Sequence, residues 1–155
     1  MPLAPGGAGA AAAYIGEMAA EPRVEIDDLP VDECLELLRT QRVGRLAVST
    51  PDGPAIFPVN YAIGGDRVVF RTDPGTKLDA SVLQRVAFEI DAIDPDEGTG
   101  WSVVVEGVAT EIGGAIDPRS VELQALEVHP FPPGEKMHLV EIHPRVISGR
   151  RLVLR

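Results

Sequence analysis

The sequence predicts a mainly β protein: an antiparallel β-barrel of six or seven strands with a few helices. From Arg45 onward, short runs of β-branched and aromatic residues alternate with turns rich in glycine, proline and aspartate. Two of these turns, an Asp-Gly pair within 50–54 and Gly-Gly-Asp within 63–66, have the composition of hairpin connections, which join antiparallel neighbours. The predicted strands are 45–49, 55–62, 68–72, 86–94, 101–112, 137–142 and 146–154.

The chain is expected to consist of a tail and one domain. Residues 1–22 are rich in alanine, glycine and proline and lack the basic start of a secretion signal, so we expect a flexible tail, or alternatively a helix packed on a partner subunit. A G-x-G-x-x-A match at 7–12 follows no predicted strand and is interpreted as chance. Residues 23–155 are enough to bury a core and are expected to form a single domain.

Charge and hydropathy limit the classes of partner. The formal net charge is −10, from 24 acidic and 14 basic residues, which argues against nucleic acid or an anionic membrane as a partner. No apolar run approaches the roughly 20 residues of a membrane span, so we expect a soluble protein. The single cysteine, Cys34, cannot form an intrachain disulfide and is compatible with the cytoplasm.

Three elements are expected outside the predicted strands listed above. A short strand is predicted at 24–26, and a helix at 31–41 follows it, with acidic residues in its first turn, arginines at its end and Gly44 beyond. A second helix is predicted over 117–128, since Asp117 can act as its N-cap and Pro118 can occupy the first helical position.

The stretch 58–78 combines a hairpin, cationic side chains and a helix start. Its second strand ends in Arg71 and Thr72, and Thr76 can cap a helix whose first turn contains Lys77 and Leu78. A helix N-terminus favours anions and disfavours a lysine, so Lys77 is explained if an anion lies beside it. Arg71 and Lys77 can then converge on one phosphate. The alternative is that both pair with nearby aspartates on a solvated surface.

Several single residues are further candidates for a ligand site. Pro58 cannot donate to a strand ladder, so it predicts an edge or a bulge and makes Val59, Asn60 and Tyr61 a place where backbone groups can face a ligand. Asn60 can instead satisfy a local backbone group. Trp101 is compatible with a core, a dimer or a ligand contact. The three histidines have no metal-site spacing and are expected to be independent.

Three segments of the sequence resemble a known protein family. PVNY, VVFRT-x-PGTKL and TGWSVVVEG are similar to the pyridoxamine 5′-phosphate oxidase-like family of FMN-binding split barrels, in particular its small nitroimidazole-resistance-type branch, over about 29–152. The resemblance implies a homodimer with two FMN molecules at its interface. It places Asn60 and neighbouring backbone at the flavin ring, and Trp101 and Ser102 near it, from either subunit. The residues implied to hold the ribityl phosphate are Phe70, Arg71, Thr72 and Lys77, with Leu78 next to them.

The function expected from this reasoning is flavin-dependent oxidation and reduction of a small molecule. The sequence has no P-loop, serine elbow or catalytic triad, so a cofactor would have to carry the chemistry. With FMN, an electron-poor acceptor such as a quinone or nitroaromatic is expected. Deazaflavin and haem are alternative cofactors, because the resemblance extends to proteins that bind them. A non-catalytic dimeric binding module and an interaction protein without any cofactor are the alternative functions.

Overall fold

The structure is a computed structural model that describes residues 21–72, 84–112, 122, 125, 126, 128 and 138–155. Seven strands and one helix are found in this part of the chain. In chain order they are β1 (Val24–Leu29), α1 (Val31–Leu38), β2 (Val43–Thr50), β3 (Gly53–Gly64), β4 (Arg67–Thr72), β5 (Arg85–Asp94), β6 (Thr99–Glu111) and β7 (His138–Leu154). No helix among the described residues is long and apolar enough to cross a membrane.

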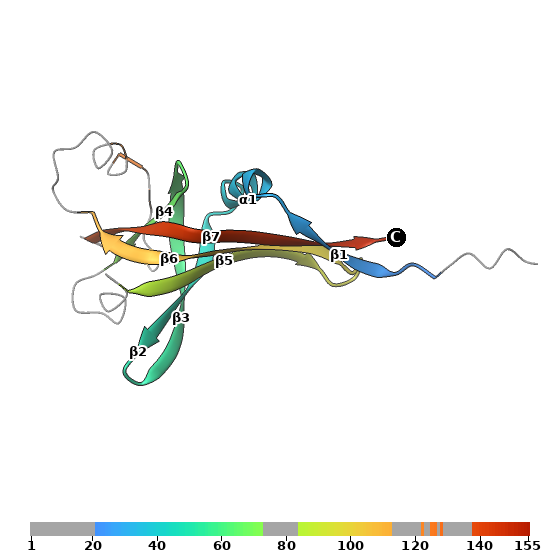
Figure 1. The fold of residues 1–155 in the computed structure, drawn as a ribbon, viewed down its shortest axis with the longest axis horizontal. Coiled ribbons are helices and arrows are strands. Elements are labelled where there is room, and N and C mark those ends of the chain that lie inside the picture. The colour runs from blue at the N-terminus through green and yellow to red at the C-terminus, as the bar shows by residue number, and fades with distance from the viewer. Residues whose placement is uncertain (1–20, 73–83, 113–121, 123–124, 127, 129–137) are drawn as a thin grey trace, which may run out of the picture.

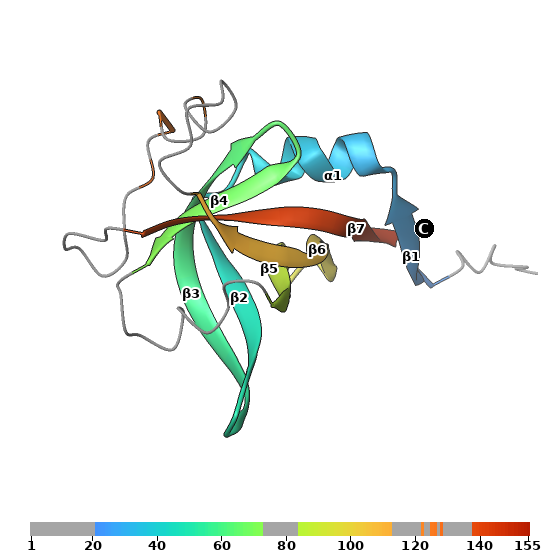
Figure 2. The same cartoon turned by 60° about the vertical axis from the view of Figure 1, so that its left-hand side comes forward.

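The seven strands form one antiparallel sheet that closes on itself. The strand order is β1-β7-β4-β3-β2-β5-β6, and an additional pairing between β7 and β6 closes a six-stranded barrel, with β1 attached outside it along the end of β7. Figures 1 and 2 show this arrangement, with α1 against one side of the barrel. The prediction of a mainly β, antiparallel barrel is confirmed.

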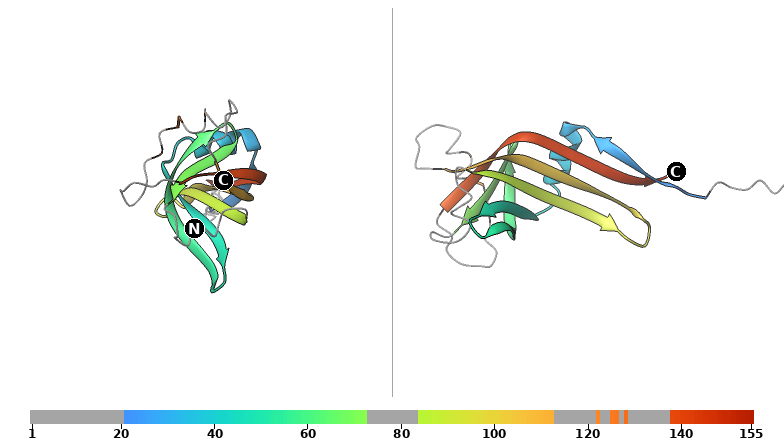
Figure 3. Two further views of the ribbon diagram at one scale, coloured as in Figure 1. Left: turned by 90° about the vertical axis from the view of Figure 1, so that its left-hand side faces the viewer. Right: turned by 60° about the horizontal axis from the view of Figure 1, so that its bottom comes forward.

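The last strand departs from the prediction. The two strands predicted at 137–142 and 146–154 are one continuous strand, β7, whose first part pairs with β4 and β6 and whose second part pairs with β6 and β1. A β-bulge opposite Glu106 and Gly107 takes up the change of direction. Figure 3 shows β5, β6 and β7 running on together beyond the barrel.

Local contacts explain the other differences in boundaries. Helix α1 was predicted to reach Gln41 but ends at Leu38, because the N–H groups of Arg39 and Thr40 bond to carbonyls three residues back, at 3.1 and 2.9 Å, and so tighten the last turn. The strand predicted at 24–26 is longer, since all six residues of β1 pair with β7. Most of the helix predicted at 117–128 lies outside the described residues.

Pro58 confirms the prediction of a strand edge. Residues Gly53–Asn60 of β3 pair with β2, whereas Tyr61–Gly64 pair with β4, so no described strand lies on the second side of the β3 segment that contains Pro58. The missing N–H of Pro58 therefore removes no ladder bond from a second neighbour. This part of β3 and the adjoining β2 project from the barrel as a hairpin (Figure 2).

The core lies inside the barrel and under α1. Phe88 is fully buried, and its ring meets Tyr61 edge to face with centroids 4.8 Å apart. The Tyr61 hydroxyl donates a hydrogen bond to the Leu38 carbonyl at 2.5 Å, which ties the end of α1 to β3. Burial raises the pKa of Tyr61 far above its ordinary value, so the hydroxyl stays protonated and donating. The core thus fixes the position of β3 relative to α1.

Candidate functional site

Two predicted site residues lie together on the outer face of β3 and β4. Tyr61 of β3 lies opposite Phe70 of the antiparallel strand β4. Their chain neighbours Asn60 and Arg71 therefore lie side by side, one residue beyond this pair. Side chains alternate along a strand, and Tyr61 and Phe70 face the core, so Asn60 and Arg71 face outward. Both are half-buried, and neither side chain makes a hydrogen bond or ion pair within the described part of the chain.

Thr72 is next to Arg71 and contains an unsatisfied hydroxyl. The residue is 1% exposed, and its Oγ1 has no hydrogen-bond partner among the described residues. Leaving a buried hydroxyl unpaired costs about 1–3 kcal/mol, so such groups in native proteins usually have an acceptor. By strand alternation, Thr72 faces the same side of β4 as Phe70 and the opposite side from Arg71, so the two side chains do not converge on one phosphate. Of these two residues, the outward-facing Arg71 fits the phosphate end of a flavin mononucleotide.

The rest of the predicted phosphate site cannot be compared with the structure. Lys77 and Leu78 lie outside the described residues, as do the aspartates considered as alternative partners. Arg71 makes no ion pair with any acidic residue in the described ranges. The convergence of Arg71 and Lys77 on one anion stays a prediction.

Three of the predicted contact residues present their side chains to the core and not to a ligand. Val59, Tyr61 and Phe70 are 4%, 6% and 0% exposed, and all three belong to the main hydrophobic cluster. The Tyr61 hydroxyl is already bound to Leu38, and the Phe70 ring is enclosed. These residues position Asn60 and Arg71, and direct contact with a ligand is limited to their backbone.

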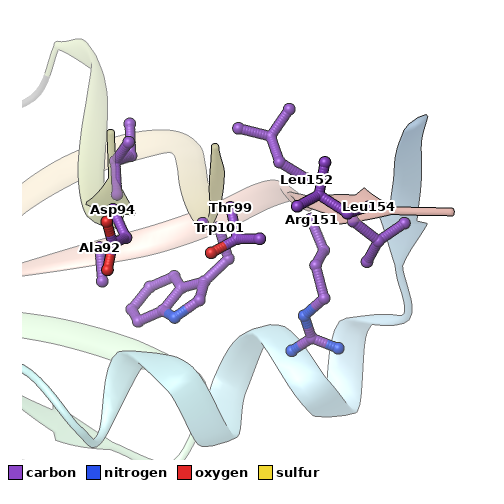
Figure 4. Close-up of a pocket in the computed structure, with 10 residues that line it drawn as sticks. Ala92, Asp94, Thr99, Trp101, Arg151, Leu152 and Leu154 are labelled. Atoms are coloured by element: carbon purple, nitrogen blue, oxygen red, sulfur yellow. The ribbon is translucent and has the colours of Figure 1, made fainter. Parts of the chain in front are cut away.

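Trp101 and Ser102 point to opposite faces of β6. Trp101 pairs with Ala92 on one side and Arg151 on the other, and it packs against the core cluster. Figure 4 shows the indole and the Arg151 guanidinium both directed toward α1, along an open groove of about 680 Å³. Arg151 Nη2 pairs with Glu33 Oε1 of α1 at 2.5 Å. Because successive residues alternate, Ser102 faces away from this groove.

Trp101 lies far from Arg71 within one chain. Arg71 pairs with Leu139 at one end of β7, and Trp101 pairs with Arg151 near the other end. The twelve residue-to-residue steps from 139 to 151 correspond to about 40 Å along an extended strand. One mononucleotide cannot bridge that length. If Trp101 and Arg71 contact the same flavin, they must come from different subunits.

A polar cluster on β4, β6 and β7 was not predicted. His143 Nε2 lies 2.8 Å from Glu141 Oε1 and 2.9 Å from Thr110 Oγ1, while Arg67 contacts His143 Nδ1. His138 contacts Glu111 and not the groups around His143, in line with the expectation that the histidines are independent of one another. No group of three metal-ligating side chains occurs among the described residues. The cluster depends on the register between strands, which the sequence does not specify.

The charges of this cluster should contribute to stability. The Arg67 and Glu141 side chains are only 16% and 14% exposed, and within the described ranges Arg67 Nε and Glu141 Oε2 make no hydrogen bond. Replacing Glu141 with glutamine removes the negative charge next to Arg67 and is expected to lower the free energy of unfolding by about 1–3 kcal/mol. Urea unfolding measures this change. Glu36→Gln is the control, because Glu36 pairs with Arg39 on the surface and its side chain is 80% exposed. This control should change the free energy of unfolding by less than about 0.5 kcal/mol. Equal effects of the two substitutions would contradict the prediction.

Comparison with known proteins identifies the family. Residues 30–151 match the family model described as pyridoxamine 5′-phosphate oxidase, and the chain belongs to this family. The family predicted from the sequence motifs is confirmed.

Individual relatives agree with this assignment. The uncharacterized protein Rv0080 of Mycobacterium tuberculosis is 36% identical over 135 residues, which cover 83% of this chain and 87% of the relative. The FAD binding protein from Mycobacterium smegmatis is 35% identical with a TM-score of 0.69, covering 81% of this chain and 98% of that one. An FAD-binding protein from Mesorhizobium loti, 23% identical with a TM-score of 0.67 and covering 84% and 99%, shares the fold.

Proposed function

We propose that this protein is a homodimeric, FMN-binding oxidoreductase that reduces a small electron-poor molecule. The observation that carries the proposal is the placement of the Asn60 and Arg71 side chains on one face, where neither pairs with another described residue. Family membership and the flavin binding of the 35% identical Mycobacterium smegmatis relative support it.

Each residue has a distinct role in this proposal. The Arg71 guanidinium donates charge-assisted hydrogen bonds to the cofactor phosphate. The Asn60 amide both donates and accepts, so it can hold the polar edge of a flavin ring in one orientation. The bound flavin would supply two-electron transfer, and the protein supplies position and exclusion of water.

The outer face of the sheet supports a homodimer. Strand pairing places five residues in one row across β3, β2, β5, β6 and β7: Ile56, Ala47, Ala87, Glu106 and Val146. Ile56 is 68% exposed and Val146 is 50% exposed, and no described helix lies over this row. Two large exposed apolar side chains in one row are compatible with a surface that another chain covers.

A charge in this row should dissociate the dimer. Ile56→Lys is expected to shift the protein to a monomer, because an ammonium group would be buried without a partner. Sedimentation velocity over a range of concentrations measures the change. Val31→Lys provides the control, since Val31 is 51% exposed on α1, and it should leave the assembly intact. A wild-type monomer, or an Ile56→Lys dimer of unchanged stability, would contradict the homodimer.

Absorption spectra with separate titrations of FMN, deazaflavin and haem test the cofactor. Tight, stoichiometric FMN binding to the purified protein is expected. Binding of only deazaflavin or haem would keep the fold and overturn the cofactor. Reduction of bound FMN by a nicotinamide cofactor, followed by reoxidation by a quinone or nitroaromatic, tests the activity. Flavin that no donor reduces would instead favour a non-catalytic binding module.

A further inference from the structure

Six of the eleven arginines in the described part of the chain make no ion pair with a described carboxylate, and two of these six, Arg85 and Arg145, lie at the β-bulge. Ion pairs with carboxylates are made by Arg39, Arg45, Arg67, Arg151 and Arg155. Arg85 and Arg145 are both exposed and make no ion pair in the described part of the chain, yet they line the same pocket of about 230 Å³. Two unpaired cations therefore share one small pocket.

The bulge and a glycine bring these two arginines together. Val146 lies opposite Glu106 and Pro144 lies opposite Gly107, so Arg145 is the extra residue of the bulge. On the other side of β6, Arg85 pairs with Val108. A Cβ atom on Gly107 would lie 2.0 Å from the His143 carbonyl oxygen, so a side chain at this position would push the strands apart. Arg85 and Arg145 thus approach β6 from its two neighbouring strands.

The charges of this pocket favour an anionic ligand. The chain has 24 acidic and only 14 basic residues, so carboxylates are abundant, but Glu106 is the acidic residue that lines this pocket and it pairs with neither arginine. Like charges that share a small pocket repel each other unless an anion lies between them. The pocket is smaller than the roughly 300–1,000 Å³ of most ligand sites, which suits a single oxyanion group.

We propose that Arg85 and Arg145 bind a phosphate group, as free phosphate or as a phosphomonoester, at a site separate from that of Arg71. Arginine presents planar donors that match phosphate oxygens, and an anion between the two guanidinium groups neutralises both. Arg71 lies opposite Leu139, six positions before Arg145 on β7, or about 20 Å along the strand. The two sites are therefore separate within one chain, and the Arg85–Arg145 pocket adjoins the proposed dimer surface through Glu106 and Val146.

Isothermal titration of the full chain with inorganic phosphate and with AMP tests this site. Arg85→Gln and Arg145→Gln are each expected to weaken phosphate binding at least tenfold, and the double variant should lose it. Arg23→Gln is the matched control, because Arg23 is exposed at the start of β1 and makes no ion pair with any described residue. Arg71→Gln should leave phosphate binding at Arg85 and Arg145 unchanged while it weakens FMN. Circular dichroism confirms that each variant is folded.

The outcomes separate this proposal from the proposed function. Tighter binding of AMP than of inorganic phosphate supports a phosphomonoester ligand, and the reverse order supports free phosphate. No saturable binding of either ligand would overturn the proposal. It would also be overturned if phosphate binding were lost in Arg71→Gln but kept in Arg85→Gln and Arg145→Gln. Failure of FMN to bind affects only the proposed function.

Discussion

Arg71→Ala is expected to weaken FMN binding by about 1–3 kcal/mol, or roughly 5- to 150-fold in Kd. Arg71 is half-buried on the outer face of β4 and has no carboxylate partner in the described chain, so its donors are available to a phosphate. Lys77→Ala is expected to have an effect of the same size, since the sequence places Lys77 beside the same anion. Fluorescence or absorption titration of the apoprotein with FMN measures both.

Two further titrations make this result specific. Arg23→Ala, which removes an exposed arginine at the opposite end of the molecule, should leave FMN affinity unchanged. Riboflavin lacks the phosphate, so its affinity should be nearly the same in wild type and Arg71→Ala. Equal FMN affinity in wild type, Arg71→Ala and Lys77→Ala would refute the phosphate assignment.

Phe88→Ala is expected to lower the free energy of unfolding by about 3–5 kcal/mol, because the fully buried ring leaves a cavity in the barrel core. The same ring excludes a side chain at Gly44: a Cβ there would lie 2.1 Å from Phe88 Cζ. Gly44→Ala in the wild type should therefore lower the free energy of unfolding by about 1–3 kcal/mol through overpacking. Urea unfolding of the single and double variants measures both changes.

The double variant tests whether the two effects share one cause. In the Phe88→Ala background the ring that clashes with a methyl group at position 44 is gone. Gly44→Ala should therefore hardly change the free energy of unfolding in that background. The coupling energy is then about 1–3 kcal/mol. Additive changes would show that Gly44 is required for a reason other than the Phe88 ring.

Much of the fold is contained in local sequence patterns. The hairpins around 50–54 and 63–66 were predicted because turn residues and the strands beside them are neighbours in the chain. The continuity of β7 was not predicted. Its two halves have different partners, and Pro144 between them is compatible with a strand only because a bulge accommodates it. That information lies in the pairing of distant segments.

The candidate site was predictable to a similar extent. Arg71 and Asn60 were found because they are close in the sequence and have chemistry suited to a nucleotide. The orientation of Phe70 into the core follows from strand alternation, which could have been applied to β4 in advance. The cluster of Arg67, Glu141 and His143 needed the register of β4 with β7, and the separation of Trp101 from Arg71 needed the length of β7.

The position of β7 in the chain has a consequence for biosynthesis. Residues 24–29 pair with 149–154, and β7 also supplies partners for β4 and β6, so the barrel cannot close until the whole strand has left the ribosome. Contacts between such distant segments slow folding. Until β7 is synthesised, the edges of β4 and β6 that pair with it stay unpaired and can pair with other chains. Cellular yield should therefore depend on how quickly β7 is released and docks.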